Sequence, residues 1–344
     1  MPSRHLLYAL TALLLVLCPL NLLAQTERRC VVTFYNVENL FDTIDNPATA
    51  DEDMHPLADK QWNDKRYRQK IASLARVIAD MGVDGKLPAI VALAEVENRR
   101  VVEELVQHPS IAKARYGICH FDSPDKRGID VALLYRPDIF SLEKAEVLRV
   151  SDNSFSTRDI LAISGQLCGE KALLFVNHWP SRIGGTKQTE QRRIACARKL
   201  RSAIDEAIKE DCNTKIIVMG DMNDNPSDHS IKRLLGARST LRKLSPDALY
   251  NPLGRGFGIG SSRYEGRWNH FDQILLSANL VGRNRTGIGF DSSRRRESMA
   301  YVFRRDYMCD KRGFPLPTYR GTDYTGGVSD HLPVCVILQQ NIGK

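Results

Sequence analysis

The sequence lacks the short motifs that mark several common protein classes. No two cysteines are spaced as CxxC, which argues against a structural zinc site. A GxxxxGKS/T loop is absent, and the glycine-rich run GRGFGIGSS follows no predicted strand, so nucleotide binding through such a loop is not supported. There is also no internal repeat of fixed period and no low-complexity linker. The sequence therefore has to be interpreted from its other features.

Long apolar runs are confined to the start of the chain. Leu6–Leu23 is almost continuously apolar, and residues 1–24 resemble a secretory signal peptide with cleavage after Ala24. An uncleaved anchor helix is the alternative, because a run of this length could just span a bilayer. A lipid anchor at Cys18 is disfavoured by the large residue before it. We therefore expect a secreted or periplasmic protein with one mature domain, residues 25–344, and no membrane span after cleavage.

Cysteine usage leaves the disulfides unassigned. Of the eight cysteines one, Cys18, lies in the leader, so the mature chain keeps seven. An odd number means that at least one cysteine is unpaired or pairs between chains. An exported protein could form one or two disulfides, but the spacing does not say which. The seven are Cys30, Cys119, Cys168, Cys196, Cys212, Cys309 and Cys335.

Basic residues exceed acidic ones. The chain carries 49 Lys and Arg against 41 Asp and Glu, a formal charge of +8, and removal of Arg4 with the leader leaves +7. This balance favours an anionic partner without naming it. Much of the excess is local, as in Arg294–Arg296, where no aromatic residues are interleaved as in a base-stacking platform. The Arg294–Arg296 run is explained equally well by a solvated loop as by a site for an anionic partner.

Apolar runs of strand length are scattered among helical patterns along the whole mature chain, which predicts one compact α/β domain. Strands are expected at 30–36, 89–94, 130–135, 172–177, 216–219, 271–277 and 332–338. Helices are expected at 62–81, 99–107, 186–208 and 228–235. The helix at 186–208 is strongly basic, with Arg193 predicted on an outer face. Residues 250–268 show no periodicity and are predicted as a long surface loop.

The segment KIIVMGDMNDNP looks central to the chain. Its apolar run predicts a buried strand, and Asp221, Asn223 and Asp224 follow within a few residues. Carboxylate and carboxamide oxygens delivered to one point suit a hard divalent cation, or a water molecule that is being deprotonated. The alternative is an ordinary turn, since Asn and Asp also favour turns for conformational reasons. The other predicted strands decide between these readings.

Polar side chains also stand at the ends of the other predicted strands. Two histidines, several carboxylates and two amides form the inventory needed to cleave a phosphate ester, in which a cation neutralises charge, a base activates water and an acid protonates the leaving oxygen. Individually each has a simpler explanation; Glu95 could begin the next helix. Together they predict one site, made of Asn36, Glu95, Asp130, His178, Asp221, Asn223, Asp272, Asp330 and His331.

An ordered set of segments resembles a known family. FYNVENLF, AEVEN, RGIDVALLYRP, VNHWPSR, GDMNDNP, FDQILLS and SDHLPV, spread over residues 31–338, are similar to the endonuclease/exonuclease/phosphatase superfamily, which includes pancreatic deoxyribonuclease. FYNVENLF and NHWPSR look most like secreted bacterial nucleases. The resemblance implies a four-layered sandwich, two packed mixed β-sheets flanked by helices, with the site at one edge.

The resemblance also implies a metal and a phosphate site. Glu95 would bind Mg²⁺ or Mn²⁺, with help from Asp330 and from Asn36. Asp221 would orient or deprotonate the attacking water. Asn36 and Asn223 would hydrogen-bond phosphoryl oxygens.

Two histidines complete the implied site. His331 matches the catalytic histidine of the superfamily, with Asp272 as its carboxylate partner. His178 matches the second histidine of the pancreatic deoxyribonuclease type, with Asp130 to orient it. That branch usually has Glu near the position of Asp130, so this sequence departs from the family's pattern at the residue expected to pair with His178.

We therefore expect a secreted, metal-dependent phosphodiesterase, foremost a nuclease that cleaves DNA or RNA with little sequence preference and has no stable protein partner. Arg127, Arg182 and Arg192 could grip flanking phosphates or be ordinary surface charges. One alternative is the same chemistry on a sphingomyelin headgroup or an inositol phosphate. Another is a non-catalytic binding module, which the intact acidic and histidine positions disfavour.

Overall fold

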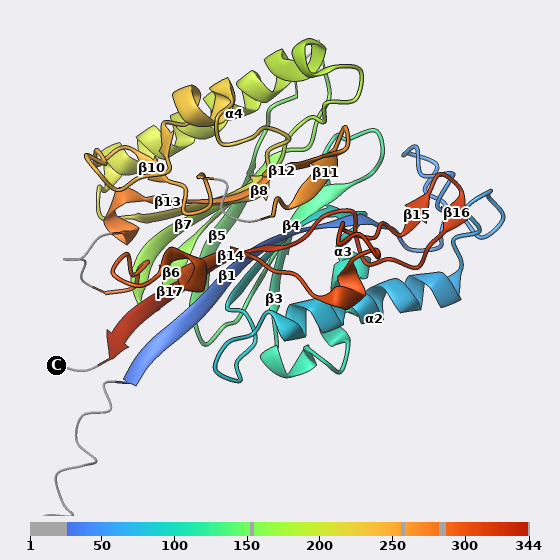
Figure 1. The fold of residues 1–344 in the computed structure, drawn as a ribbon, viewed down its shortest axis with the longest axis horizontal. Coiled ribbons are helices and arrows are strands. Elements are labelled where there is room, and N and C mark those ends of the chain that lie inside the picture. The colour runs from blue at the N-terminus through green and yellow to red at the C-terminus, as the bar shows by residue number, and fades with distance from the viewer. Residues whose placement is uncertain (1–25, 152–154, 256–258, 282–286, 343–344) are drawn as a thin grey trace, which may run out of the picture.

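The computed structural model describes residues 26–151, 155–255, 259–281 and 287–342, so the predicted signal peptide lies outside the described residues. Two β-sheets pack against each other and helices cover their outer faces (Figure 1). The expected four-layered α/β sandwich is confirmed. None of the helices within the described ranges is long and apolar enough to cross a membrane.

The first sheet has six strands. Its order is β14-β17-β1-β2-β4-β3. Helices α2 (Asp64–Asp80) and α3 (Arg99–Gln107) contact it through β1, β2 and β3. The strands are β1 (Thr26–Leu40), β2 (Ile90–Val96), β3 (Gly117–His120), β4 (Asp130–Tyr135), β14 (Ala300–Val302) and β17 (Val334–Ile342).

The second sheet has seven strands in the order β5-β6-β7-β8-β13-β10-β9. Helix α4 (Thr186–Glu210) covers its outer face, where Leu200 and Ile204 join the apolar cluster of Phe175 and Val218. The strands are β5 (Phe140–Leu148), β6 (Ile160–Leu167), β7 (Glu170–His178), β8 (Lys215–Asp221), β9 (Ala237–Arg238), β10 (Leu249–Tyr250) and β13 (Asp272–Ser277).

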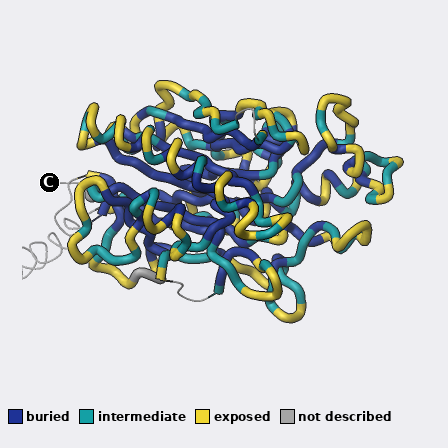
Figure 2. Tube along the Cα trace, turned by 90° about the horizontal axis from the view of Figure 1, so that it is seen from above, coloured by how far each residue is buried: buried dark blue, intermediate teal, exposed yellow. Residues whose placement is uncertain are grey.

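Local chemistry sets where the two helices on the first sheet begin. The Asn63 side chain accepts hydrogen bonds from the first free amides of α2, those of Lys65 and Arg66, at 3.1 and 3.2 Å. Asn98 does the same for Val101 in α3 at 3.1 Å. Such caps satisfy donors that have no partner inside the helix. The strands between the helices are buried, and exposed residues are concentrated in the connections (Figure 2).

The site is placed by two parallel strand pairs. β1 pairs with β2 in parallel through α2, and β7 pairs with β8 in parallel through α4. A parallel pair needs such a crossover, so the carboxyl ends of both strands come to the same edge. Polar residues that follow the apolar run of each strand therefore meet at one end of the sandwich.

Two sequence predictions are corrected. The predicted loop 250–268 contains a hairpin, β11 (Ser262–Tyr264) and β12 (Arg267–Asn269). Its turn residues Glu265 and Gly266 have φ of 48° and 76°, the left-handed pair that a tight two-residue turn requires. Arg193 is fully buried rather than on an outer face of α4, because it pairs with the carboxylate of Asp224 in the turn that follows β8. The other short elements are α5 (Arg296–Met299), β15 (Tyr319–Arg320) and β16 (Asp323–Tyr324).

Candidate active site

Three predicted residues lie in one row across the seven-stranded sheet. His178, Asp221 and Asp272 end or begin the neighbouring strands β7, β8 and β13, and the register pairs His178 with Asp221 and Asp221 with Asp272. Paired residues of adjacent strands lie on the same face of a sheet, about 5 Å apart. The sheet alone therefore gathers a histidine and two carboxylates.

Asp221, at the end of β8, lies next to site residues from both sheets. Its Oδ2 atom accepts a hydrogen bond from Asn36 Nδ2 of β1 at 3.0 Å. The same oxygen lies 3.7 Å from His178 Nε2 and 3.8 Å from His331 Nε2. Burial and the nearby charge of Asp272 raise the pKa of Asp221 to about 7. Asp221 can therefore exchange a proton near neutral pH.

Glu95 reaches the site because β2 bulges there. The pairing with β4 skips Glu95, whose φ is +65°. Such a bulge re-aims a side chain, and a left-handed non-glycine residue costs about 1 kcal/mol or more. The carboxylate is held by Asn36 Nδ2 at 3.2 Å and by the backbone amide of Asn39 at 3.0 Å, and it lies 3.8 Å from His178 Nε2. The strained backbone thus points Glu95 at the other site residues.

His331 has the partner that the sequence predicted. Its Nδ1 atom lies 2.7 Å from Asp272 Oδ2, and its backbone amide donates to Ser329 Oγ at 3.0 Å. The hydrogen bond between His331 and Asp272 joins the two sheets, because His331 precedes β17 and Asp272 begins β13. Burial disfavours charge on the imidazole, but the carboxylates of Asp272, Asp330 and Asp221 outweigh it and raise the pKa of His331 well above its usual range.

His178 has no such partner. Its Nδ1 atom is buried and makes no hydrogen bond to any described residue. Arg158 lies behind it and donates to the backbone carbonyls of His178 and Trp179 at 3.2 and 2.9 Å. Burial, followed by the charges of Arg158, Arg127 and His331, lowers the pKa of His178 well below its usual range. The surroundings of His178 therefore favour its neutral form, whereas those of His331 favour the charged form.

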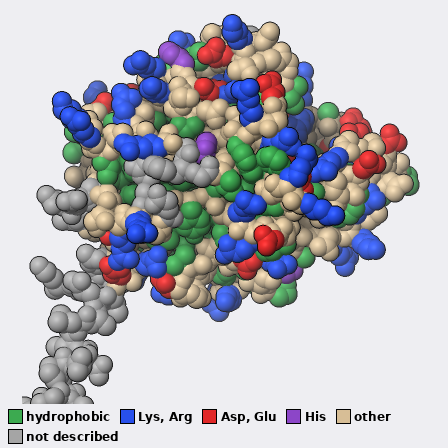
Figure 3. Space-filling model, viewed as in Figure 1, with side chains coloured by type: hydrophobic (Ala, Val, Ile, Leu, Met, Phe, Trp, Pro, Cys, Tyr) green, Lys and Arg blue, Asp and Glu red, His purple; other side chains and the backbone are tan. Residues whose placement is uncertain are grey.

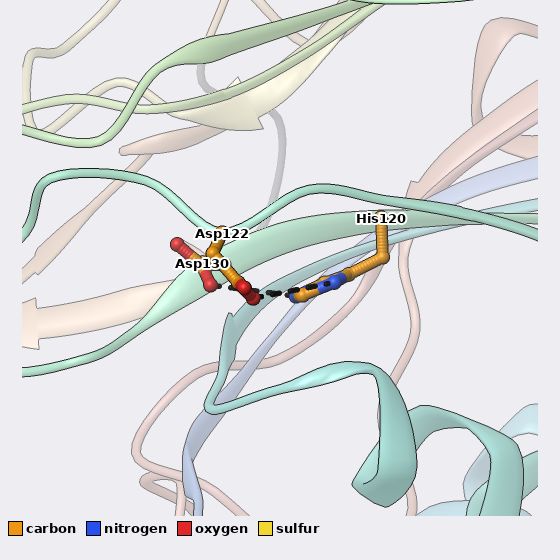
Figure 4. A group of neighbouring side chains, drawn as sticks. All are labelled: His120, Asp122 and Asp130. Atoms are coloured by element: carbon orange, nitrogen blue, oxygen red, sulfur yellow. Dashed lines mark ion pairs between the residues drawn. The ribbon is translucent and has the colours of Figure 1, made fainter.

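The predicted pairing of Asp130 with His178 is not formed. Asp130 accepts hydrogen bonds from the amide of Ser123 at 2.9 Å and from its hydroxyl, and it faces His120 Nε2 at 3.4 Å (Figure 4). The cause is topological. β3 and β4 are antiparallel neighbours, so the end of β3 at His120 meets the start of β4, whereas His178 belongs to the other sheet.

Of the polar residues in the turn that follows β8, only some contact the site. Asp224 turns away and accepts from Arg193 Nε at 2.8 Å, Arg182 Nη2 at 2.9 Å and Ser230 Oγ at 2.6 Å. It fastens the turn to α4 instead. Asn223 donates its amide to the Trp179 carbonyl at 3.0 Å, and its own backbone amide donates to Asp221 Oδ1 at 3.0 Å.

The two amides thus contact protein groups in this structure. Asn36 uses both Nδ2 hydrogens on Glu95 and Asp221, and its Oδ1 atom accepts from the amide of Glu38 at 3.0 Å. Asn36 therefore orients the two carboxylates that it joins. A contact of Asn36 or Asn223 with a phosphoryl oxygen stays a prediction.

The oxygen donors fit a hard divalent cation. Asp221, Asp272 and His331 each offer one atom within 4.8 Å of the others, and Asp272 Oδ1 is buried without a hydrogen bond from the described residues. The half-exposed Asp330 has its Oδ1 atom 4.0 Å from His331 Nε2, beside this group. Carboxylate and amide oxygens are the ligands that Mg²⁺ and Mn²⁺ prefer. The assignment of Glu95 and Asp330 as the ligands stays a prediction.

Sequence reasoning missed a buried lysine behind the site. Lys70 of α2 donates to Thr318 Oγ1 and to the Val328 carbonyl, both at 2.6 Å, and lies 3.9 Å from Glu38. Burial, opposed by Lys70, raises the pKa of Glu38 to about 7. Through its hydrogen bonds to Thr318 and Val328, Lys70 holds the segment that leads into Ser329. A lysine in a helix normally faces solvent, so no sequence signal marks Lys70 as buried.

The three arginines predicted to grip phosphate differ in position. Arg127 is half-exposed, and its Nη2 atom lies 3.9 Å from Glu95 Oε2, at the mouth of the site. Arg182 is committed to Asp224 and Asp228, and Arg192 is exposed on α4. Lys and Arg side chains are also scattered over the face seen in Figure 3, with acidic side chains between them. Arg127 is therefore the candidate that the geometry favours.

Groups that can accept and donate a proton on either side of one buried carboxylate are what the hydrolysis of a phosphate ester needs. The two-sheet fold is that of a known class of such hydrolases. The sequence model described as the endonuclease/exonuclease/phosphatase family matches residues 31–340. The chain therefore belongs to this family, whose members hydrolyse phosphate ester bonds and depend on a divalent metal ion. No curated protein sequence matches the chain significantly.

Solved structures show the same fold. An endonuclease/exonuclease/phosphatase family protein from Bacteroides thetaiotaomicron has a TM-score of 0.57 at 15% identity, over 92% of this chain and 97% of that one. D. rerio TDP2, complexed with a single-strand DNA product, has 0.54 at 15% identity, over 90% and 98%. The human Nocturnin catalytic domain with bound sulfate has 0.53 at 16%, over 90% and 94%. At these identities the similarity shows the fold alone.

Proposed function

We propose that the protein is an exported, metal-dependent phosphodiesterase that hydrolyses DNA or RNA with little sequence preference. The observation that carries the proposal is the position of Asp221 Oδ2, which lies within 3.8 Å of the reactive nitrogens of both histidines. One buried carboxylate between a neutral and a charged imidazole is suited to a reaction that takes a proton on one side and gives one on the other.

The proposed reaction is attack of water on phosphorus in line with the leaving oxygen. Neutral His178 takes the proton of the attacking water, which the carboxylate of Asp221 orients. Charged His331, held in orientation by Asp272, gives its proton to the leaving oxygen. The two acid–base steps then use groups whose pKa values are displaced in opposite directions, as such steps require.

Glu95 and Asp330 would hold Mg²⁺ or Mn²⁺, which when bound neutralises charge on the phosphoryl group. The rest of the site supports that arrangement. Asn36 fixes the Glu95 carboxylate from one side and the amide of Asn39 fixes it from the other. Arg127, at the mouth of the site, supplies a positive charge for a flanking phosphate.

Nucleic acid is the favoured substrate for two reasons. The chain is basic, and Lys and Arg side chains are dispersed over the face in Figure 3, which suits a polyanion longer than one phosphate. D. rerio TDP2, which shares the fold, has been solved with a single-strand DNA product. Export is supported by the apolar leader, and N-terminal sequencing of the exported protein should begin at Gln25.

The deciding experiment gives residues 25–344 four substrates, with and without EDTA. Plasmid DNA, RNA, bis(nitrophenyl) phosphate and sphingomyelin are incubated with the wild type, with His331→Ala and with a control, His229→Ala, which changes an exposed histidine. Nicked plasmid or degraded RNA that needs metal and His331, and does not need His229, supports the proposal. Release of choline phosphate alone, or inertness towards all four substrates, overturns it.

A further inference from the structure

Two thiols lie against each other at the end of the sandwich opposite the site. Cys30 Sγ and Cys168 Sγ are 3.7 Å apart. Among the cysteines that the structure describes, no other pair makes a sulfur–sulfur contact. A disulfide bond has a length of about 2.05 Å, so a small change of the two side chains would close it. We propose that Cys30 and Cys168 are an oxidative modification site and form a disulfide in the exported protein.

The bond would join the two sheets. Cys30 lies in β1 of the six-stranded sheet, paired with Leu338 of β17. Cys168 lies in the turn between β6 and β7 of the seven-stranded sheet, and its carbonyl already accepts a hydrogen bond from Gln340 of β17 at 3.3 Å. The covalent link would therefore close a loop of well over a hundred residues, which lowers the entropy of the unfolded chain.

The turn is suited to hold a reactive thiol. Cys168 has φ of +52° and is followed by Gly169 at +84°, so a tight turn presents the side chain at a partly exposed position. The hydrogen bond with Cys30 and the nearby Arg28 lower the pKa of Cys168 to about 7, against the effect of burial. Thiolates, not thiols, attack disulfides. Cys168 is therefore the attacking group, and the buried Cys30 is the group that resolves the intermediate.

The step needs a disulfide oxidant such as oxidised glutathione. The Cys168 thiolate attacks its sulfur–sulfur bond and releases one glutathione thiolate. Cys30, after losing its proton, attacks the mixed disulfide at Cys168 and releases the second. The protein pair loses two electrons and two protons, and two molecules of glutathione thiol are formed. Neither the catalytic site nor its metal takes part, so the inference does not depend on the proposed activity, but it rests on the export that the proposed function includes.

Peptide mapping tests the link directly. The full-length chain is exported, or residues 25–344 are treated with oxidised glutathione; the protein is then unfolded, alkylated without reduction and digested with trypsin. Cleavage after Arg29 and Arg158 gives peptides 30–60 and 159–171, each with one cysteine. We expect these two peptides as one species lighter than their sum by two hydrogen atoms, with the other five cysteines alkylated. Full alkylation of Cys30 and Cys168, or a link between other cysteines, overturns the proposal.

Thermal unfolding provides a second readout that does not depend on a variant folding as well as the wild type. Each protein is compared with itself in the oxidised and reduced forms. The wild type and Cys212→Ser, which changes an exposed cysteine, should each gain about 5 °C or more on oxidation. Cys30→Ser and Cys168→Ser should gain nothing. An equal gain in all four proteins contradicts the assignment.

Discussion

The two histidines meet at one carboxylate but lie in opposite surroundings. His331 precedes a strand of the six-stranded sheet and is hydrogen-bonded to a carboxylate from the other sheet, which favours its charged form. His178 ends a strand of the seven-stranded sheet, has no carboxylate on its inner nitrogen and has Arg158 behind it, which favours its neutral form. Similar side chains are thus given different protonation states by what each sheet places next to them.

This difference teaches that the site is made by the packing of the sheets rather than by either sheet alone. The contact of Asp272 with His331 and that of Asn36 with Asp221 both cross from one sheet to the other. A change that separates the sheets would therefore abolish the acid and the base together. The comparison also assigns distinct roles, which the following changes are chosen to separate.

The largest effect is expected from removing either imidazole. His178→Ala and His331→Ala should each lower kcat on DNA by about 10²- to 10⁴-fold, the usual contribution of a catalytic acid or base. Circular dichroism should show that both variants fold, and His229→Ala should keep full activity. Wild-type turnover by either site variant would refute the role of that histidine.

A better leaving group should separate the two roles. Nitrophenolate is a stable anion that departs without being protonated. The sugar oxygen of DNA, in contrast, needs a proton as it leaves. His331→Gln should therefore lose at least about tenfold less activity on bis(nitrophenyl) phosphate than on DNA, and His178→Gln should lose the same on both. The measurement is kcat/KM for each pair. Rescue of His178→Gln instead would reverse the assignment.

Asp272→Asn should shift the pH dependence and lower kcat by about 10²-fold. In the wild type we expect the acidic limb of the kcat/KM profile near pH 7, where Asp221 takes up a proton, and an alkaline limb where His331 loses one. The carboxylate of Asp272 raises both pKa values, so the variant should move both limbs to lower pH. A profile unchanged in position would show that Asp272 does not act through these groups.

The smallest effect is expected at Asp130. Because it contacts Ser123 and His120 rather than His178, Asp130→Asn should change kcat/KM by less than about threefold. Loss of its hydrogen bonds should lower the free energy of unfolding by about 1 to 3 kcal/mol, measured by urea denaturation. If Asp130→Asn were as inactive as Asp272→Asn, the two histidines would be oriented alike and the comparison would fail.

Much of this arrangement could be predicted from the sequence. Apolar runs located seven strands of the two sheets but not β3, β5 or β6. The helix at 99–107 and the strand at 130–135 have the predicted bounds, because burial and caps are local signals. Polar residues at the ends of those runs located His178, Asp221 and Asp272. Parallel strands then had to bring their ends together.

What could not be predicted depends on packing between distant segments. The sequence does not show which sheet a strand joins, so it does not reveal that Asp130 faces His120 rather than the predicted His178. Nor does it show a bulge, and Glu95 reaches the site through one. Arg193 and Lys70 look like surface charges on basic helices, but each is buried because a carboxylate or carbonyl from elsewhere meets it.

Histidine NMR tests the opposed protonation states most directly. Metal-free protein labelled with ¹⁵N-histidine is titrated through neutral pH in EDTA, with His178→Gln and His331→Gln to assign the signals. We predict that the ring of His331 remains an imidazolium above pH 7 while that of His178 is a neutral imidazole throughout. If both rings titrate together near the ordinary value of about 6.5, the division of labour described here is contradicted.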